Sequence, residues 1–429
     1  MIFGRWYTLG PLGLAAIALA YIAGFAGPEE RPSGDPGFLA PDAELELLVD
    51  GAKEDLFFTE GVVVTCDRRI LFSDMLVGEP GKLDGRRADK IVEYHPDTRT
   101  ISVFRSPSGG SNGNRMDLAC HLLTAERHRL VRTDMAMGRA EVVAGPDEGG
   151  AYDALNDIAV DSRGRIYVTH PRYGAEHPDS VREAGVYRID ADGAVTRIIT
   201  DAARPNGIAI CPDERHIYVG SYDYEADADR EMALLRYDLA PDGTAANRRM
   251  LVDYAPRNGP DGLVCDTEGN LWVAVQDRNR PGIYAYSVAE GGATERAYIP
   301  TPELPTNVHF GRGDDANYLY VTAGNSLYGI RVGKLGHHLQ RRRAAKRSSD
   351  GVRRRVGCGP ADAGSRPDPE AAGWRPERGP VLPWRRRGGA RRALRPRSRA
   401  DAIMAGACQA CGRWRWRGRA RSTRRCSTT

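Results

Sequence analysis

The sequence lacks several features by which common enzyme classes are recognised. Residues 42–336 contain no long apolar stripe at helical period, which disfavours a parallel sheet covered by helices. No glycine-rich phosphate-binding loop stands between a strand and a helix, so a nucleotide-dependent enzyme is unsupported. Cys408 and Cys411 lack a second ligand pair at zinc spacing, so they do not indicate a metal or redox site.

The spacing of the cysteines between residues 42 and 336, called the body below, does not predict a particular set of disulfides. They lie inside or beside apolar, β-rich runs such as "NGIAICPD" and "DGLVCDTEG". A free thiol in such a run usually behaves as a small hydrophobic side chain. We therefore expect free thiols rather than disulfides at Cys66, Cys120, Cys211 and Cys265.

The N-terminal part is an apolar run followed by a Pro-, Gly- and Glu-rich stretch. Residues 1–28 are interpreted as a signal peptide or membrane anchor, and residues 29–41 as a linker. The small residues Gly24 and Ala26 suit a signal peptidase, which favours a cleaved signal over an anchor through residues 6–27. Both interpretations predict an exported body, whether periplasmic, secreted or membrane-anchored.

The C-terminal part differs abruptly in composition from the body. Residues 337–429 hold 26 Lys and Arg against six Asp and Glu, and four of the six Trp, with no sustained period. This composition is typical of a disordered tail. Because it follows a finished domain, an out-of-frame or non-native extension is the favoured hypothesis.

The body contains six copies of one pattern: turn residues, an aliphatic, an aromatic, Val and a small residue. Their central positions are about 52, 44, 51, 54 and 48 residues apart, the length of one four-stranded propeller blade. "AELELLVDG" before the first copy can supply the outermost strand of the last blade. The sequence thus predicts an all-β, six-bladed β-propeller over residues 42–336. The central positions are Leu71, Leu123, Tyr167, Tyr218, Trp272 and Tyr320.

Polar residues stand about 11 to 13 positions before each centre, at the start of the preceding strand. In a propeller the first strand of each blade is innermost, so these residues are expected to form a ring at the central channel. Asn and Asp also occur at turns, which is the alternative explanation for these residues. However, all six positions are polar and one of them is Glu, a poor turn former, so a ring is favoured. The ring residues are Glu60, Asn112, Asn156, Asn206, Asp261 and Asn307.

The chemistry of this ring favours one hard cation. Carboxylate and amide oxygens suit Ca²⁺, with Mg²⁺ or Mn²⁺ as substitutes. Zn²⁺ is a further alternative, although the ring lacks the His or Cys of a typical zinc site.

Residues just past the second strand of each blade are expected to form an outer wall around the ring. His170 could carry protons near neutral pH, although a lone His is more often a structural hydrogen bonder. "GGSNG" matches a nucleophile-elbow pattern at Ser111, but a β-repeat follows where that motif needs a helix. The predicted wall residues are Asp74, Glu126, His170 and Ser221.

Five stretches together resemble the gluconolactonase / senescence marker protein (regucalcin) family of six-bladed propellers. They are "TEGVVV", "NDIAVDSRGRIYVTHPRYG", "RPNGIAICPDERHIYVGS", "GPDGLVCDTEGNLWVAV" and "PTNVHF" with "YLYVTAGNSLYGI". The resemblance implies one divalent cation, often Ca²⁺, at the channel mouth, and hydrolysis of lactones or organophosphates. Carried over by motif, its ligands would be Glu60, Asn156, Asn206 and Asp261.

Three departures from the family pattern bear on this interpretation. "EGV" replaces Glu-Gly-Pro and could loosen the loop that carries Glu60. His170 stands where the resembling proteins more often show Asp, which bears on substrate choice. "DLACH" replaces a Gly-containing turn, which bears on folding alone.

The leading hypothesis is an exported, metal-dependent hydrolase that opens a small-molecule lactone or ester. Asp261 would act as general base, or less favourably as nucleophile. The expected substrate contacts are Asn112, Glu126, His170 and Asn307. The alternatives are a phosphotriesterase or arylesterase on the same ion, and a non-catalytic Ca²⁺-binding propeller that binds a ligand or protein. No nucleic-acid partner is expected for the propeller.

Overall fold

The computed structural model describes residues 31–76, 89–147, 149–173, 180–224 and 230–339. The predicted hydrophobic segment at residues 1–28 and the tail from residue 340 lie outside these ranges. Within them, no helix is long and apolar enough to cross a membrane. The described chain continues past the predicted boundary at residue 336, and His338 is buried with its Nε2 2.9 Å from the Gly311 carbonyl oxygen.

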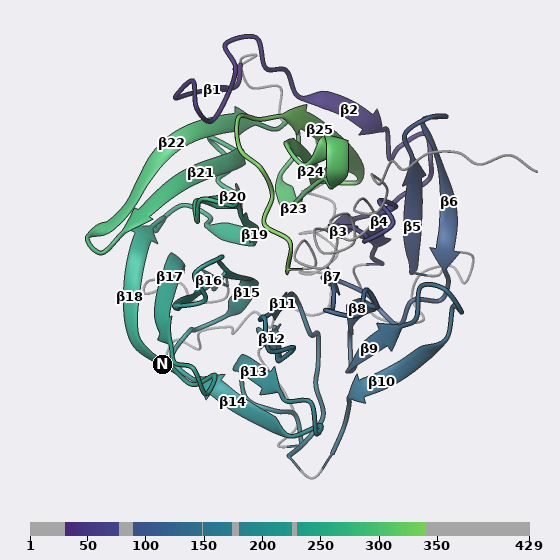
Figure 1. Cartoon of the computed structure of the whole chain (residues 1–429), viewed down its shortest axis with the longest axis vertical. Helices are drawn as coiled ribbons and strands as arrows, with labels where there is room; N and C mark the ends of the chain where they lie inside the picture. Colours follow the sequence, from purple (N-terminus) through teal and green to yellow (C-terminus); the bar gives the residue numbers. More distant parts are fainter. Residues whose placement is uncertain (1–30, 77–88, 148, 174–179, 225–229, 340–429) are drawn as a thin grey trace, which may run out of the picture. The chain divides into compact units, whose positions relative to one another are not determined.

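The prediction of a six-bladed β-propeller is confirmed. Each repeat forms one antiparallel sheet whose strands run outward in chain order, except that β2 (Glu46–Val49) is the outermost strand of the last sheet, and Figure 1 shows the six sheets arranged around a centre. The innermost strands are β3 (Thr59–Val64), β7 (Asn114–Met116), β11 (Ile158–Val160), β15 (Pro205–Ile210), β19 (Pro260–Cys265) and β23 (Pro305–Phe310). The second strands, which carry the six central positions, are β4 (Ile70–Asp74), β8 (Leu122–Glu126), β12 (Ile166–His170), β16 (His216–Tyr222), β20 (Leu271–Val275) and β24 (Tyr318–Ala323).

The outer half of each blade is formed by two further strands. The third strands are β5 (Lys90–His95), β9 (Arg129–Thr133), β13 (Gly185–Ile189), β17 (Met232–Leu239), β21 (Gly282–Ala289) and β25 (Ser326–Arg331). The rim is formed by β6 (Thr100–Arg105), β10 (Ala140–Ala144), β14 (Val195–Ile199), β18 (Ala245–Asp253), β22 (Gly292–Pro300) and β2 (Glu46–Val49). A short strand, β1 (Ser33–Gly34), pairs with β22, and one 3₁₀ turn, η1, spans Gly313–Asp315.

The core lies between neighbouring sheets and is filled by the inner and second strands. These strands are rich in aliphatic and aromatic residues, which suit a pleated surface that is covered on both faces. Trp272 is fully buried, and its ring lies edge to face against Phe310 of the next blade at a centroid distance of 5.7 Å. The rim strands are much more exposed. The positions of the ring residues are therefore fixed by the inner strands, which are buried on both faces.

The predicted closure of the circle is also confirmed. β2, which precedes the first blade in the sequence, pairs antiparallel with β25 and completes the last sheet. The N-terminal part of the body therefore joins the last blade to the first.

The prediction of free thiols in the body is wrong, because the four cysteines form the disulfides Cys66–Cys120 and Cys211–Cys265. In each pair the partners are 54 residues apart, about one blade, and this spacing places them side by side on adjacent blades. Cys120 has a positive φ of 66° in the "DLACH" turn, where a Gly-containing turn was expected.

Removing either disulfide is expected to destabilise the propeller. A cross-link between blades restricts the unfolded chain, and its loss typically costs roughly 2–5 kcal/mol. Guanidinium unfolding of a Cys211→Ser/Cys265→Ser variant should show this loss relative to the oxidised wild-type protein. Reductant should lower the wild-type midpoint further than that of the double variant, which keeps one disulfide. An unchanged midpoint in the double variant would contradict the stabilising role.

Candidate functional site

The six predicted ring residues are all buried, and each lies within the first three residues of an innermost strand or, for Asn112 and Asn156, two residues before it. The inner strands converge at the centre of the propeller in Figure 1, so their first residues face one channel. Contacts between blades place these residues next to one another. The Gly113 N–H donates to the Asn156 carbonyl at 2.8 Å, and the Thr169 hydroxyl donates to the Asn206 carbonyl at 2.6 Å.

A glycine follows four of the six ring residues and lets the next blade approach closely. A Cβ at Gly207 would lie 2.1 Å from the Asp261 carbonyl oxygen, and one at Gly61 would lie 2.0 Å from that of Asn112. Gly61 also has a positive φ of 54°. A polar residue followed by Gly is thus the sequence feature that marks these ring positions. The glycine allows neighbouring blades to come close enough to close the ring.

Replacing Gly207 by Ala is expected to open the ring. Because the added methyl group would meet backbone rather than a flexible side chain, overpacking should cost about 1–3 kcal/mol and displace Asp261. The temperature of thermal unfolding should fall, and the hydrolysis predicted from the sequence should be impaired. Gly291→Ala is the matched control, because nothing lies within 4 Å of a Cβ at that position. Equal behaviour of the two variants would contradict close contact at the ring.

The ring carboxylates are held in an environment that opposes their ionisation. Burial raises the pKa of Glu60 well above its ordinary value, and the charges of Asp261 and Asp157 raise it further. Burial and the charge of Asp157 likewise raise the pKa of Asp261. Burial also raises the pKa of Asp157 to about 6, although its hydrogen bond from Ile158 N–H favours the charged form. A cation bound beside these three acids would stabilise their ionised form.

Neighbouring side chains orient the ring amides and carboxylates. Asn206 donates from Nδ2 to the Tyr173 hydroxyl at 2.9 Å, and its buried Oδ1 has no hydrogen-bond partner among the described residues. Gln276 donates from Nε2 to Asp261 Oδ2. Asn307 Oδ1 accepts the Val308 N–H at 2.8 Å, which leaves its amide nitrogen for acidic neighbours. The free acceptor of Asn206 is the kind of group that a hard cation requires.

The donor set of the ring fits one divalent cation. Glu60 and Asp261 would supply carboxylates, and Asn206 would supply its unpaired amide oxygen. Within the described part of the chain, no three His, Cys, Asp or Glu side chains are grouped as metal ligands, so amide oxygens would have to complete the set. An all-oxygen set of this kind favours Ca²⁺ or a similar ion.

Two expected substrate contacts are not brought to the ring by the structure. His170 is fully buried, with Nε2 2.9 Å from the Asp153 carbonyl oxygen and Nδ1 3.3 Å from that of Glu183. Glu126 is buried and forms ion pairs with Arg105 at 3.0 Å and with Arg129 at 2.6 Å. Both side chains hold connections between strands, and their role as substrate contacts stays a prediction.

The other wall residues are likewise buried in local contacts. Asp74 accepts the N–H groups of Phe57 and Phe58 at 2.7 and 3.2 Å, and Ser221 Oγ accepts that of Arg204 at 3.3 Å. They therefore anchor the connections that enter the inner strand of their own blade. Ser111, dismissed above as a nucleophile, is fully buried and donates to Ser108 Oγ at 2.8 Å.

Sequence reasoning missed three residues that contact the ring. Asp157 stands directly after Asn156, and this carboxylate beside an amide was a visible signal of a second buried acid. Gln276 directly follows β20, one position beyond the predicted wall register. Tyr173 lies in the connection after β12 and reaches Asn206 through space, for which the sequence holds no local signal.

The fold and the ring together define a six-bladed β-propeller with a buried, oxygen-rich site at the start of its inner strands. Residues 58–325 match the model of the SMP-30/gluconolactonase/LRE-like region family, which is more than half of the chain. The protein therefore belongs to this family, and the resemblance seen in the sequence is confirmed.

Three characterised relatives share parts of the sequence. A gluconolactonase of Zymomonas mobilis is 26% identical over 326 residues, covering 69% of this chain and 85% of the relative. An L-arabinolactonase of Azospirillum brasilense is 33% identical over 172 residues, covering 39% and 52%. A diisopropyl-fluorophosphatase of Loligo vulgaris is 27% identical over 284 residues, covering 62% and 86%.

Solved structures support the same fold. A gluconolactonase from Xanthomonas campestris has a TM-score of 0.56 at 24% identity, with 71% of this chain and 95% of that chain covered. A calcium-binding regucalcin from Agrobacterium tumefaciens has a TM-score of 0.53 at 20% identity, with 68% and 95% covered. At these identities the likeness concerns the fold alone.

Proposed function

We propose that the protein is a divalent-cation-dependent hydrolase that opens a lactone. The observation that carries this proposal is the buried ring, in which Glu60 and Asp261 have raised pKa values beside the unpaired amide oxygen of Asn206. The similarity to a gluconolactonase and an L-arabinolactonase supports the choice of reaction.

In the proposed mechanism, the residues that would hold one divalent ion are Glu60, Asn156, Asn206 and Asp261. A cation at this position would act as a Lewis acid that polarises the lactone carbonyl and stabilises the negative charge developing on its oxygen. Asp261 would accept the proton of the attacking water as the general base. Gln276 fixes one oxygen of that carboxylate, so the base has a defined orientation.

The remaining ring amides are assigned to the substrate. Asn112 and Asn307 lie in the same register as the proposed ligands but outside the family's ligand motifs. Asn112 has a buried Oδ1 without a partner in the described chain, and this oxygen is suited to accept a substrate hydroxyl. Substitution of either amide should therefore raise KM more than it weakens metal binding.

We also propose that the propeller matures outside the cytoplasm. Disulfides persist in oxidising compartments and are rare in reducing ones. The two cross-links between blades therefore support the export predicted from the apolar N-terminal run.

A substrate panel with and without chelator tests the proposed function. It should contain a six-carbon and a five-carbon sugar lactone, an acyl lactone, an aryl ester and a fluorophosphate triester. Hydrolysis of a lactone that stops on chelation and returns with Ca²⁺ is the expected result. Preference for the triester would favour the second candidate, which the similarity to a diisopropyl-fluorophosphatase supports. Calcium binding without turnover of any compound would contradict an enzyme and favour a binding propeller.

A further inference from the structure

A second cavity, of about 700 Å³, lies at the far end of the fourth blade. It is lined by residues of the connections 161–165, 211–215 and 240–244 and by side chains of β17 and β18. The ring stands at the first residues of the inner strands, whereas two of these connections follow the last residues of β11 and β15. The two sites are therefore separated by about the length of a six-residue strand, roughly 20 Å.

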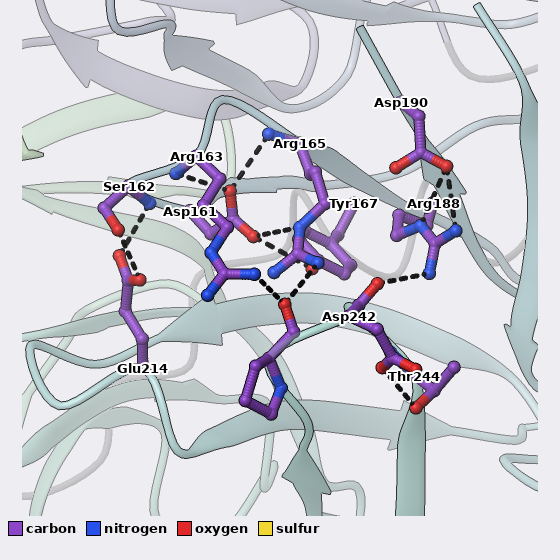
Figure 2. Close-up of polar contacts among 11 residues, drawn as sticks. Asp161, Ser162, Arg163, Arg165, Tyr167, Arg188, Asp190, Glu214, Asp242 and Thr244 are labelled. Carbon is purple, nitrogen blue, oxygen red and sulfur yellow. Dashed lines mark hydrogen bonds and ion pairs between the residues drawn. The ribbon is translucent and has the colours of Figure 1, made fainter.

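The cavity is lined by five arginines, five carboxylates and one histidine. Figure 2 shows that much of this charge joins the third blade to the fourth. Arg165 Nε lies 2.6 Å from Asp161 Oδ2, and Arg165 Nη1 donates to the Pro241 carbonyl at 3.0 Å. The Ser162 N–H and hydroxyl both donate to Glu214 at 2.6 Å. These charges have partners within the protein.

Arg236 of β17 is different, because it is a buried charge without a carboxylate partner. The residue is only 5% exposed, and no described carboxylate oxygen lies within 4.0 Å of its guanidinium nitrogens. Its Nη1 donates to the Ala289 carbonyl at 3.4 Å, and its Nε has no hydrogen-bond partner among the described residues. A guanidinium stays charged in a protein, and an unpaired buried charge is costly. An anion in the cavity would supply the missing partner.

His216 stands beside Arg236 in the same cavity. Burial lowers its pKa, and the charge of Arg236 lowers it further, so the imidazole is neutral at neutral pH. Its Nδ1 is buried without a hydrogen bond within the described chain, although Asp213 and Asp238 lie 3.8 and 3.6 Å from its ring nitrogens. A neutral imidazole beside carboxylates suits hydroxyl groups, which donate and accept hydrogen bonds.

The five carboxylates of the lining restrict the charge of the ligand. They balance the five arginines, so the lining has no excess of positive charge to attract an ion with several negative charges, such as a nucleotide or a phosphate dianion. They also accept hydrogen bonds from hydroxyl groups. A ligand with one negative charge and several hydroxyls meets both conditions.

We propose that this cavity binds a small polyhydroxylated monocarboxylate, with the carboxylate on Arg236 and hydroxyls on His216 and the neighbouring acids. Addition of water across a sugar lactone breaks the ring C–O bond and gives a carboxylate and a hydroxyl, so the product of the proposed function has this chemistry. Binding at Arg236 nevertheless does not require the ring to be catalytic.

Titration calorimetry of the full chain with sodium gluconate, in the presence of chelator, tests the proposal. Wild type should bind one gluconate, and Arg236→Met should bind it at least tenfold more weakly. Asp261→Asn should bind it as wild type does, which separates the cavity from the ring even if the ring proves inactive. Arg249→Met is the matched control, because it removes an exposed arginine of the same cavity. Sorbitol, acetate and phosphate should each bind more weakly than gluconate.

Thermal stability gives an independent test, because the substitution that weakens gluconate binding is expected to stabilise the ligand-free protein. Without ligand, Arg236→Met should unfold at a higher temperature than wild type, because it removes an unpaired buried charge. Gluconate should raise the wild-type midpoint but not that of the variant. If the variant does not fold, gluconate must still slow amide hydrogen exchange at residues 236–242 of wild type. Equal gluconate binding by wild type and Arg236→Met, tighter binding of phosphate, or no effect on wild type would each overturn the proposal.

Discussion

Replacing Asp261 by Asn is expected to lower kcat for lactone hydrolysis by roughly 10²-fold to 10⁴-fold, the range for loss of a general acid–base group. The substitution is nearly isosteric, so the fold should be kept. It removes the proposed base and one negative charge of the ring together. Excess Ca²⁺ should therefore restore little of the activity, because added ion cannot replace the proton acceptor.

Glu60→Gln is the comparison that separates these two effects. It removes a ring charge without removing the proposed base, so metal binding should weaken while excess Ca²⁺ restores much of the activity. Were Asp261→Asn to keep wild-type turnover at saturating Ca²⁺, Asp261 could not be the base. Asp157 would then be the acceptor to examine, because it is a third buried acid, and its charge raises the pKa of both ring carboxylates.

Removing divalent ions is expected to abolish lactone hydrolysis and to change how stability depends on pH. In the ion-free protein the pKa values of Glu60 and Asp261 are raised, so the folded state binds more protons than the unfolded state. Stability should therefore fall as the pH rises from about 4.5, near the unfolded pKa values, toward neutrality. Calcium should reverse this loss, because it stabilises the ionised carboxylates.

Thermal unfolding between pH 5 and pH 8, with chelator and with Ca²⁺, measures this linkage. The gain in midpoint on adding Ca²⁺ should be larger at pH 8 than at pH 5. Glu60→Gln should show a smaller pH dependence without the ion, because one of the three acids with a raised pKa is absent. A stabilisation by Ca²⁺ that is equal at both pH values would contradict a site built from these carboxylates.

The fold could be predicted from the sequence because its unit repeats. One turn-and-strand pattern recurs at the length of a blade, and the strand that closes the circle is visible before the first copy. The ring residues could be found because a fixed offset from each centre carries a polar side chain. The distance of about 11 to 13 residues between each ring residue and the centre of its repeat reflects the local geometry of one blade, which recurs in all six.

The contacts between blades were harder to predict because they depend on which connections meet in space. The disulfide partners are about one blade apart, but apolar surroundings alone could not separate a thiol from a cross-link. His170 lies in the expected register, yet its ring nitrogens face the Asp153 and Glu183 backbone. Tyr173 reaches Asn206 from a connection that has no repeat. Substrate contacts beyond the ring were therefore not predictable from periodicity.

Calorimetric titration of the chelator-treated protein with Ca²⁺ tests the central claim most directly, namely that the ring holds one cation. Wild type should bind one ion, and its activity should return over the same range of free Ca²⁺. Glu60→Gln should bind at least tenfold more weakly, whereas Glu54→Gln, which removes the same charge from an exposed position, should bind as wild type does. Equal Ca²⁺ binding by the two variants, or full activity in ion-free protein, would contradict the account.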